Sequence, residues 1–204
     1  MAPRITALVG GGQAAGKKSV CKAIVQCLNA WEITNVAVLS LSDYSVAVTT
    51  PSEGPETVDV AAAVVAITKR SEDVLLVEGM YALYEDAYRA VGNVRIYVDL
   101  DADERLSRRI VRDSEERGMT LQQVLDNYIQ VAKPAMEQYV QGTKSTADVV
   151  LMRGTEPSGI ELIAGGIYDR LSADGTNQSS VPSILPDGAR LFDEDDNAGF
   201  YELA

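Results

Sequence analysis

A glycine-rich segment near the N-terminus, VGGGQAAGKKSV at 9–20, restricts the fold of this chain more than any other feature. It follows the pattern G-x-x-x-x-G-K-[ST], except that Lys18 stands where the pattern has a hydroxyl residue. A β-rich apolar run at 5–11 precedes the loop, and residues 17–31 after it have apolar side chains at helical spacing. The segment therefore predicts a strand, a tight loop and a helix in direct succession.

Small residues in such a loop allow consecutive backbone N–H groups to point at one anion at the N-terminus of a helix. Lys17 would add its ammonium beside the same anion. A glycine-rich turn that only joins a strand to a helix is the alternative, but position, spacing and context favour anion binding. We expect the phosphates of a nucleotide to bind at Gly11, Gly12, Gln13, Ala14, Ala15, Gly16, Lys17, Lys18 and Ser19.

Lys18 leaves two interpretations of this loop open. A protonated lysine cannot coordinate a metal, and Ser19 lies about 100° further around the helix, so it is not a simple replacement. In the first interpretation, the second cation neutralises phosphate charge and leaves magnesium to carboxylates and water. In the second, the site binds nucleotide but turns over slowly.

The rest of the chain alternates between strand-like and helix-like patterns. Near-continuous apolar runs, typical of strands covered on both faces, lie at 35–42, 73–79, 94–100 and 148–152. Helical patterns lie at 57–70, 101–118, 120–140 and 158–171. We expect Pro134 to kink or divide the helix at 120–140. This order predicts the α/β class, with a mainly parallel sheet flanked by helices.

Composition narrows the function. The net charge of −12 disfavours nonspecific attraction to nucleic acid or anionic membranes, and the absence of histidine excludes imidazole catalysis. Without a long apolar run or a signal peptide, we expect a cytoplasmic protein with two buried thiols. Residues 174–204 hold seven acidic residues and one basic residue. We predict one domain over 1–173, followed by an acidic extension.

Two acidic residues come at the ends of predicted strands, where open α/β sheets bind ligands. Asp43 follows the strand at 35–42 and could accept a hydroxyl proton, while Glu78 ends the strand at 73–79 and could hold magnesium. Either acid alone would more often cap a helix or lie on the surface. Two such acids after a phosphate loop favour a functional site.

The helix at 101–118 carries five arginines in an otherwise acidic chain. A solvated face with ion pairs is the ordinary interpretation of such a pattern. Arg109 and Arg112 share a face, however, and Arg117 precedes a glycine where the helix should end. This arrangement equally suits a lid that closes guanidinium groups over a transferring phosphate.

Taken together, GGQAAGKKSV, SDY, VEGMYALY, VDLDADERLSRRIVRDSEERG and VAKPAMEQYVQGTKSTADVVLMRG resemble the uridine kinase family, which is related to phosphoribulokinase. The resemblance covers 5–171 and is strongest over 99–154. It implies a P-loop NTPase fold with a helical lid around 101–118, and transfer of the γ-phosphate of ATP, with Mg²⁺, to a nucleoside hydroxyl. Carried onto this sequence, it implies roles for Lys17, Asp43, Arg109, Arg112 and Arg117 in catalysis, for Asp43, Tyr44, Glu53 and Arg109 in acceptor binding, and for Glu78 and Asp43 at the metal.

Three departures from the family pattern affect these expectations. Lys18 replaces the magnesium-binding hydroxyl, and Met119 replaces one lid arginine. The family's F-D-H-P-D-A-F-D stretch, which contacts the acceptor, is represented only by SEGPETVD at 52–59, called the acceptor segment below. The family's hairpin that reads the pyrimidine is missing between Arg70 and Asp73. We expect a kinase acting on a nucleoside or similar small molecule with weakened base selectivity, as a monomer or a homo-oligomer. The alternative is a nucleotide-binding pseudokinase with a regulatory or interaction role.

Overall fold

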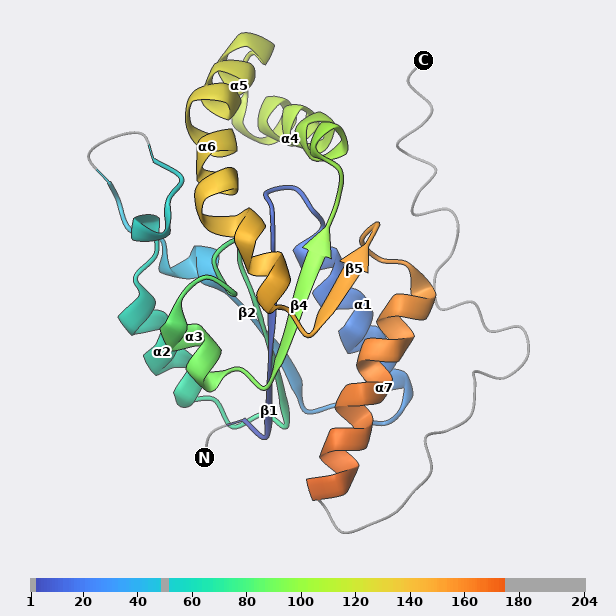
Figure 1. The fold of residues 1–204 in the computed structure, drawn as a ribbon. Helices are drawn as coiled ribbons and strands as arrows, with labels where there is room; N and C mark the ends of the chain where they lie inside the picture. The colour runs from blue at the N-terminus through green and yellow to red at the C-terminus, as the bar shows by residue number, and fades with distance from the viewer. Residues whose placement is uncertain (1–2, 49–51, 175–204) are drawn as a thin grey trace.

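The computed structural model describes residues 3–48 and 52–174, so most of the predicted acidic extension lies outside the described residues. Its centre is a parallel five-stranded sheet in the order β2-β3-β1-β4-β5 (Figure 1). The strands are β1 (Ile5–Gly11), β2 (Val36–Ser40), β3 (Val74–Glu78), β4 (Val94–Asp99) and β5 (Val149–Met152). All five predicted strands and their parallel arrangement are therefore confirmed.

Helices cover both faces of the sheet, which explains why β1 and β3 are buried along their whole length. On one face, α1 (Lys17–Ala30) and α7 (Pro157–Asp174) pack over alternate strand residues such as Ala7 and Val9. On the other face, α2 (Val60–Thr68) and α3 (Asp86–Val91) pack over the intervening residues such as Leu8. Both cysteines are buried free thiols in the first layer, as predicted.

A helical cap lies beyond the carboxyl end of β4 (Figure 1). It begins with α4 (Ala102–Arg117), which ends where Gly118 adopts a left-handed φ of 63°. Thr120 then caps α5 (Leu121–Asn127) in a reciprocal capping box with Gln123. Short 3₁₀ turns at Leu41–Tyr44, Pro55–Thr57 and Gln141–Thr146 complete the elements.

The chain after α5 differs in detail from the expected kink at Pro134. Helical backbone continues through α6 (Lys133–Ala135), with π-helical turns at Tyr128–Ala132 and Met136–Val140 on either side. A proline lacks the N–H that an α-helical turn requires, and a wider turn relieves the clash with the preceding carbonyl. Pro134 therefore changes the hydrogen-bonding pattern without interrupting the helix.

Candidate active site

The loop at 11–16 has the backbone geometry of an anion cradle. Gly11 and Gly16 have φ angles of 138° and 90°, and Ala14 is also left-handed at 57°. A Cβ on Gly11 would lie 2.4 Å from the Val98 carbonyl oxygen, so only glycine fits against β4. No side chain caps the start of α1, which leaves its first N–H groups for a ligand.

Lys17 lies across this loop. Its Nζ donates to the carbonyl oxygens of Gly11 at 3.1 Å and Gly12 at 2.7 Å. Burial lowers the pKa of Lys17 to about 8, although the nearby Glu78 carboxylate opposes the shift. By contrast, the side chains of Lys18 and Ser19 are exposed. The loop therefore holds one partly buried ammonium, which is mainly charged at neutral pH.

Glu78 occupies the predicted place at the carboxyl end of β3, where it is 4% exposed. Its register partner on β2 is Ser40, whose hydroxyl donates to Glu78 Oε1 and lies 2.7 Å from the Ser42 hydroxyl. A carboxylate beside hydroxyl oxygens suits magnesium, which prefers oxygen ligands. Within 3–48 and 52–174 no cluster of three or more acidic, histidine or cysteine side chains forms. Phosphate oxygens and water would therefore have to complete the coordination of a metal.

Asp43 and Tyr44 lie in the 3₁₀ turn that follows β2, at the same edge of the sheet as the loop. Asp43 is exposed, whereas Tyr44 is partly buried against the layer that contains α2. The Tyr44 carbonyl accepts from the backbone N–H of Asp59 at 2.9 Å, which holds the turn beside the acceptor segment. Among the described contacts, no hydrogen bond or ion pair joins Asp43 to Glu78 or to the loop.

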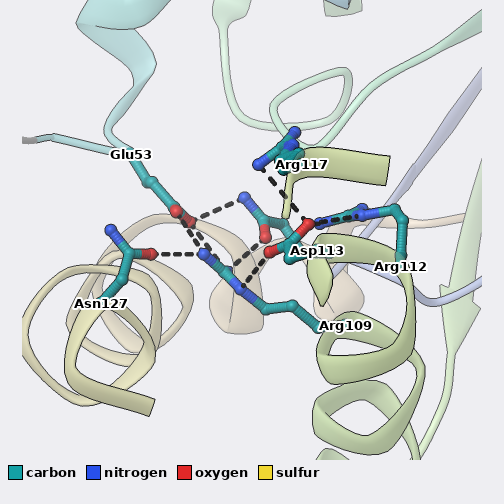
Figure 2. Close-up of polar contacts among 7 residues, drawn as sticks. Glu53, Arg109, Arg112, Asp113, Arg117 and Asn127 are labelled. Atoms are coloured by element: carbon teal, nitrogen blue, oxygen red, sulfur yellow. Dashed lines mark hydrogen bonds and ion pairs between the residues drawn. The ribbon is translucent and has the colours of Figure 1, made fainter. Parts of the chain in front are cut away.

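The predicted acceptor acid and one predicted lid arginine contact each other directly (Figure 2). Arg109 Nη2 donates to Glu53 Oε1 at 2.7 Å, and Arg109 Nη1 donates to Glu53 Oε2 at 3.2 Å. Arg109 also donates to the side-chain oxygens of Gln13 and Asn127, and Gln13 donates to Glu53 at 2.7 Å. The side chain of Arg109 is only 5% exposed, so this arginine joins the loop, the acceptor segment and α5.

Asp113, which sequence reasoning did not select, lies at the centre of the three predicted lid arginines (Figure 2). Its carboxylate is 3.3 Å from Arg109 Nε, 2.8 Å from Arg112 Nη2 and 3.5 Å from Arg117 Nη1. The only available signal was its spacing of four residues from both Arg109 and Arg117 on α4. Such spacing is common on solvated helices and does not reveal that the carboxylate is buried.

Arg105 was likewise missed as a site residue. Its Nε donates to the Leu100 carbonyl at 3.0 Å, and its Nη1 would lie 2.7 Å from a Cβ on Gly12. This guanidinium and that of Arg109 line a cavity of about 320 Å³ that extends beneath the helical cap, with Gln13 and Tyr97 also in its wall. The cavity adjoins the phosphate loop and has room for part of a small ligand.

Parallel sheets with this loop and a neighbouring strand-end acid are characteristic of P-loop nucleotide-binding proteins, and this chain has the fold of that class. The chain belongs to the Phosphoribulokinase / Uridine kinase family, whose model matches residues 56–158, half of the 204 residues. The loop lies outside the matched range, so its assignment depends on its own sequence and backbone geometry. No helix within 3–48 and 52–174 has the length and apolar character needed to span a membrane.

Named relatives include a uridine kinase of Macrococcus caseolyticus, 47% identical over 88 residues that cover 43% of each chain. A uridine-cytidine kinase 2-B of Danio rerio is 40% identical over 115 residues, covering 56% of this chain and 44% of the relative. The matched part thus spans less than half the length of these relatives.

Two solved structures share the fold. A candidate fructose transport system kinase from a Silicibacter species has a TM-score of 0.60 at 15% identity, covering 74% of this chain and 91% of that one. A possible uridine kinase from Bacillus stearothermophilus has a TM-score of 0.53, also at 15% identity, covering 74% and 90%.

Proposed function

We propose that this protein is an ATP-dependent phosphotransferase that transfers the γ-phosphate to a hydroxyl of a nucleoside or similar small molecule. The observation that carries the proposal is the buried carboxylate of Glu78 at the end of β3, whose register partner on β1 is Val9, two residues before the loop that Lys17 follows. A buried acid beside a loop ammonium is the charge arrangement that phosphoryl transfer with a metal requires.

In this proposal, the backbone N–H groups at 11–16 and the ammonium of Lys17 bind the ATP phosphates. Glu78, together with Asp43, would hold a magnesium ion, which would neutralise phosphate charge when bound. Asp43 accepts the proton of the attacking hydroxyl, because open α/β sheets bind ligands at the edge where Asp43 lies. Arg112 and Arg117 stabilise the charge on the transferring group.

The acceptor segment supports a small polyol-bearing substrate rather than a strictly selected base. Tyr44 lies in the turn that carries Asp43, its carbonyl accepts from Asp59 of the acceptor segment, and Arg109 holds Glu53 of that segment. The connection between α2 and β3 is short, and Arg70 and Glu72 pair within it at 3.0 Å. Because no hairpin extends from this connection, we propose that the protein distinguishes poorly between nucleoside bases.

An assay of ATP consumption with a panel of pyrimidine nucleosides, purine nucleosides and simple sugars tests this function. We expect turnover with several acceptors, because the connection between α2 and β3 carries no hairpin that could read a base. Exclusive use of pyrimidines would contradict the proposed selectivity, whereas tight nucleotide binding without any turnover would identify a pseudokinase.

Replacing Lys17 with alanine is expected to weaken ATP binding by about 10- to 150-fold, because a charged hydrogen bond to phosphate contributes about 1.5–3 kcal/mol. In the parent, affinity should fall as the pH rises through about 8, where the Lys17 ammonium of the free protein loses its proton. The variant should lack this decline. Calorimetry below and above that pH measures both effects, and equal affinities of parent and variant would remove the loop from the proposed site.

Replacing Lys18 with threonine is expected to raise the phosphorylation rate, by about tenfold for each 1.4 kcal/mol of transition-state stabilisation regained. Threonine would restore a hydroxyl ligand for magnesium. If Lys18 instead neutralises phosphate charge, the same change will lower ATP affinity and steepen its dependence on magnesium.

A magnesium titration of rate and ATP affinity separates these outcomes. Lys22→Thr, an exposed change one turn further along α1, is the matched control. A Lys18→Thr protein that behaves like this control would show that Lys18 acts on neither the metal nor the phosphates.

A further inference from the structure

The carboxylate of Asp113 contacts three guanidinium groups in the C-terminal half of α4. Its side chain is 1% exposed, and its Oδ1 accepts from Arg112 Nε at 2.9 Å and lies 2.8 Å from Arg112 Nη2. The same oxygen is 3.5 Å from Arg117 Nη1, while Oδ2 faces Arg109 Nε at 3.3 Å. A buried ion pair needs one cation for each anion, so three arginines around one carboxylate exceed what burial requires.

The net charge of the whole cluster also favours an anionic ligand. Glu53 is the second carboxylate in contact with these arginines, so three positive and two negative groups leave one net positive charge. The excess lies on the more exposed members, because Arg112 is 33% exposed and Arg117 is 59% exposed, whereas Arg109 is 5% exposed. The exposed parts of these two guanidiniums are therefore available to an anion from outside the cluster, such as a phosphate group.

Arg112 connects this cluster to the phosphate loop. On α4, Arg105 and Arg108 face the loop, because their Nη1 atoms would lie 2.7 Å from a Cβ on Gly12 and 3.6 Å from a Cβ on Gly16. Arg112 follows them by seven and four residues, which places it on the same face of the helix. Arg109 contacts Glu53 in the acceptor segment as well as Gln13 of the loop. Asp113 thus contacts one arginine on the loop-facing side of α4 and one that reaches the acceptor segment.

We propose that Asp113 is the positioning residue of the lid: it holds Arg112 and Arg117 toward the ATP phosphates and links them to the acceptor side through Arg109. The inference rests on the proposed function, because it assigns these arginines to phosphate. Without the carboxylate, three guanidiniums in one small region would repel one another and separate. Asp113 thereby aligns them before ATP binds, which avoids reorganisation during the reaction.

The test is a double-mutant cycle on kcat/KM for ATP with Asp113→Asn and Arg112→Ala. Asp113→Asn keeps the shape of the side chain and removes its charge, and we expect at least about a tenfold loss of kcat/KM. If Asp113 acts through Arg112, then Arg112→Ala will cause a much smaller loss in the Asp113→Asn protein than in the parent. A purely structural role of Asp113 would give equal losses in both backgrounds and would overturn the proposal.

Two further variants keep the result interpretable. Glu116→Gln, which alters an exposed acid on the same helix, should leave kcat/KM unchanged. Asp113→Glu retains the charge but displaces it, so it should fold and show a partial loss that is also coupled to Arg112→Ala, even if Asp113→Asn is too unstable to purify. An Asp113→Asn protein with higher kcat/KM would mean that the carboxylate restrains the arginines, contrary to the proposal.

The same cycle measured on the ATP dissociation constant separates failure of this inference from failure of the proposed function. If the parent phosphorylates no acceptor, the function is wrong, but coupling between Asp113 and Arg112 in ATP affinity would still support the positioning role. Additive effects on both ATP affinity and turnover would reject the positioning role in an active enzyme.

Discussion

Replacement of Asp43 with asparagine should lower kcat by about 10²- to 10⁴-fold, the usual contribution of a positioned general base. Asparagine keeps the size of the side chain but cannot accept the proton of the attacking hydroxyl. Because Asp43 is exposed and belongs to a short 3₁₀ turn, we expect the free energy of unfolding to change little. Steady-state kinetics with the best acceptor of the panel measures kcat, and calorimetry measures ATP binding. We expect kcat to fall while the affinity for ATP stays the same.

Asp126→Asn is the matched control for this change, because Asp126 is an exposed acid on α5 whose carboxylate accepts from Gln122 on the same helix. Its kcat should equal that of the parent. If Asp43→Asn also retains full turnover, Asp43 is not the base, and the acidic group that activates the hydroxyl must lie elsewhere at this edge of the sheet.

Replacement of Arg109 with alanine should lower the free energy of unfolding by about 3 kcal/mol, the lower end of the range for removing one partner of a buried ion pair. The change leaves the Glu53 carboxylate and the side chains of Gln13 and Asn127 without their guanidinium partner. Asp113 keeps Arg112 and Arg117 as partners, which limits the loss. Urea denaturation measures the difference between the two proteins.

Arg108→Ala provides the comparison on the same helix. Arg108 pairs with Glu104 at 3.5 Å, with side chains that are 40% and 53% exposed, so its removal should cost at most about 1 kcal/mol. Equal destabilisation by the two changes would show that the Arg109 network stabilises the fold no more than an exposed ion pair does.

Much of the candidate site could be predicted from sequence because its parts are local. The phosphate loop is continuous along the chain, and Glu78 ends an apolar run whose strand character is evident from its neighbours. The roles assigned to Asp43 and Tyr44 stay predictions, although the structure places both at the expected edge of the sheet. Helix α3 escaped prediction because six residues are too few to establish a helical period.

The amino-acid sequence by itself determined the alternation of strands and helices, the parallel sheet and the glycine-rich loop. These features depend on the spacing of apolar residues and on the positions of glycines, which can be recognised within a short stretch of sequence. Only the tertiary structure decided what the arginines of α4 contact. The pairing of Arg109 with Glu53 joins residues 56 positions apart, and no helical period reports such a distance along the chain. Burial of Asp113 likewise depends on the three arginines and the helical cap that enclose it. On a solvated helix, ion pairs of the same carboxylate with its neighbours would contribute little to stability.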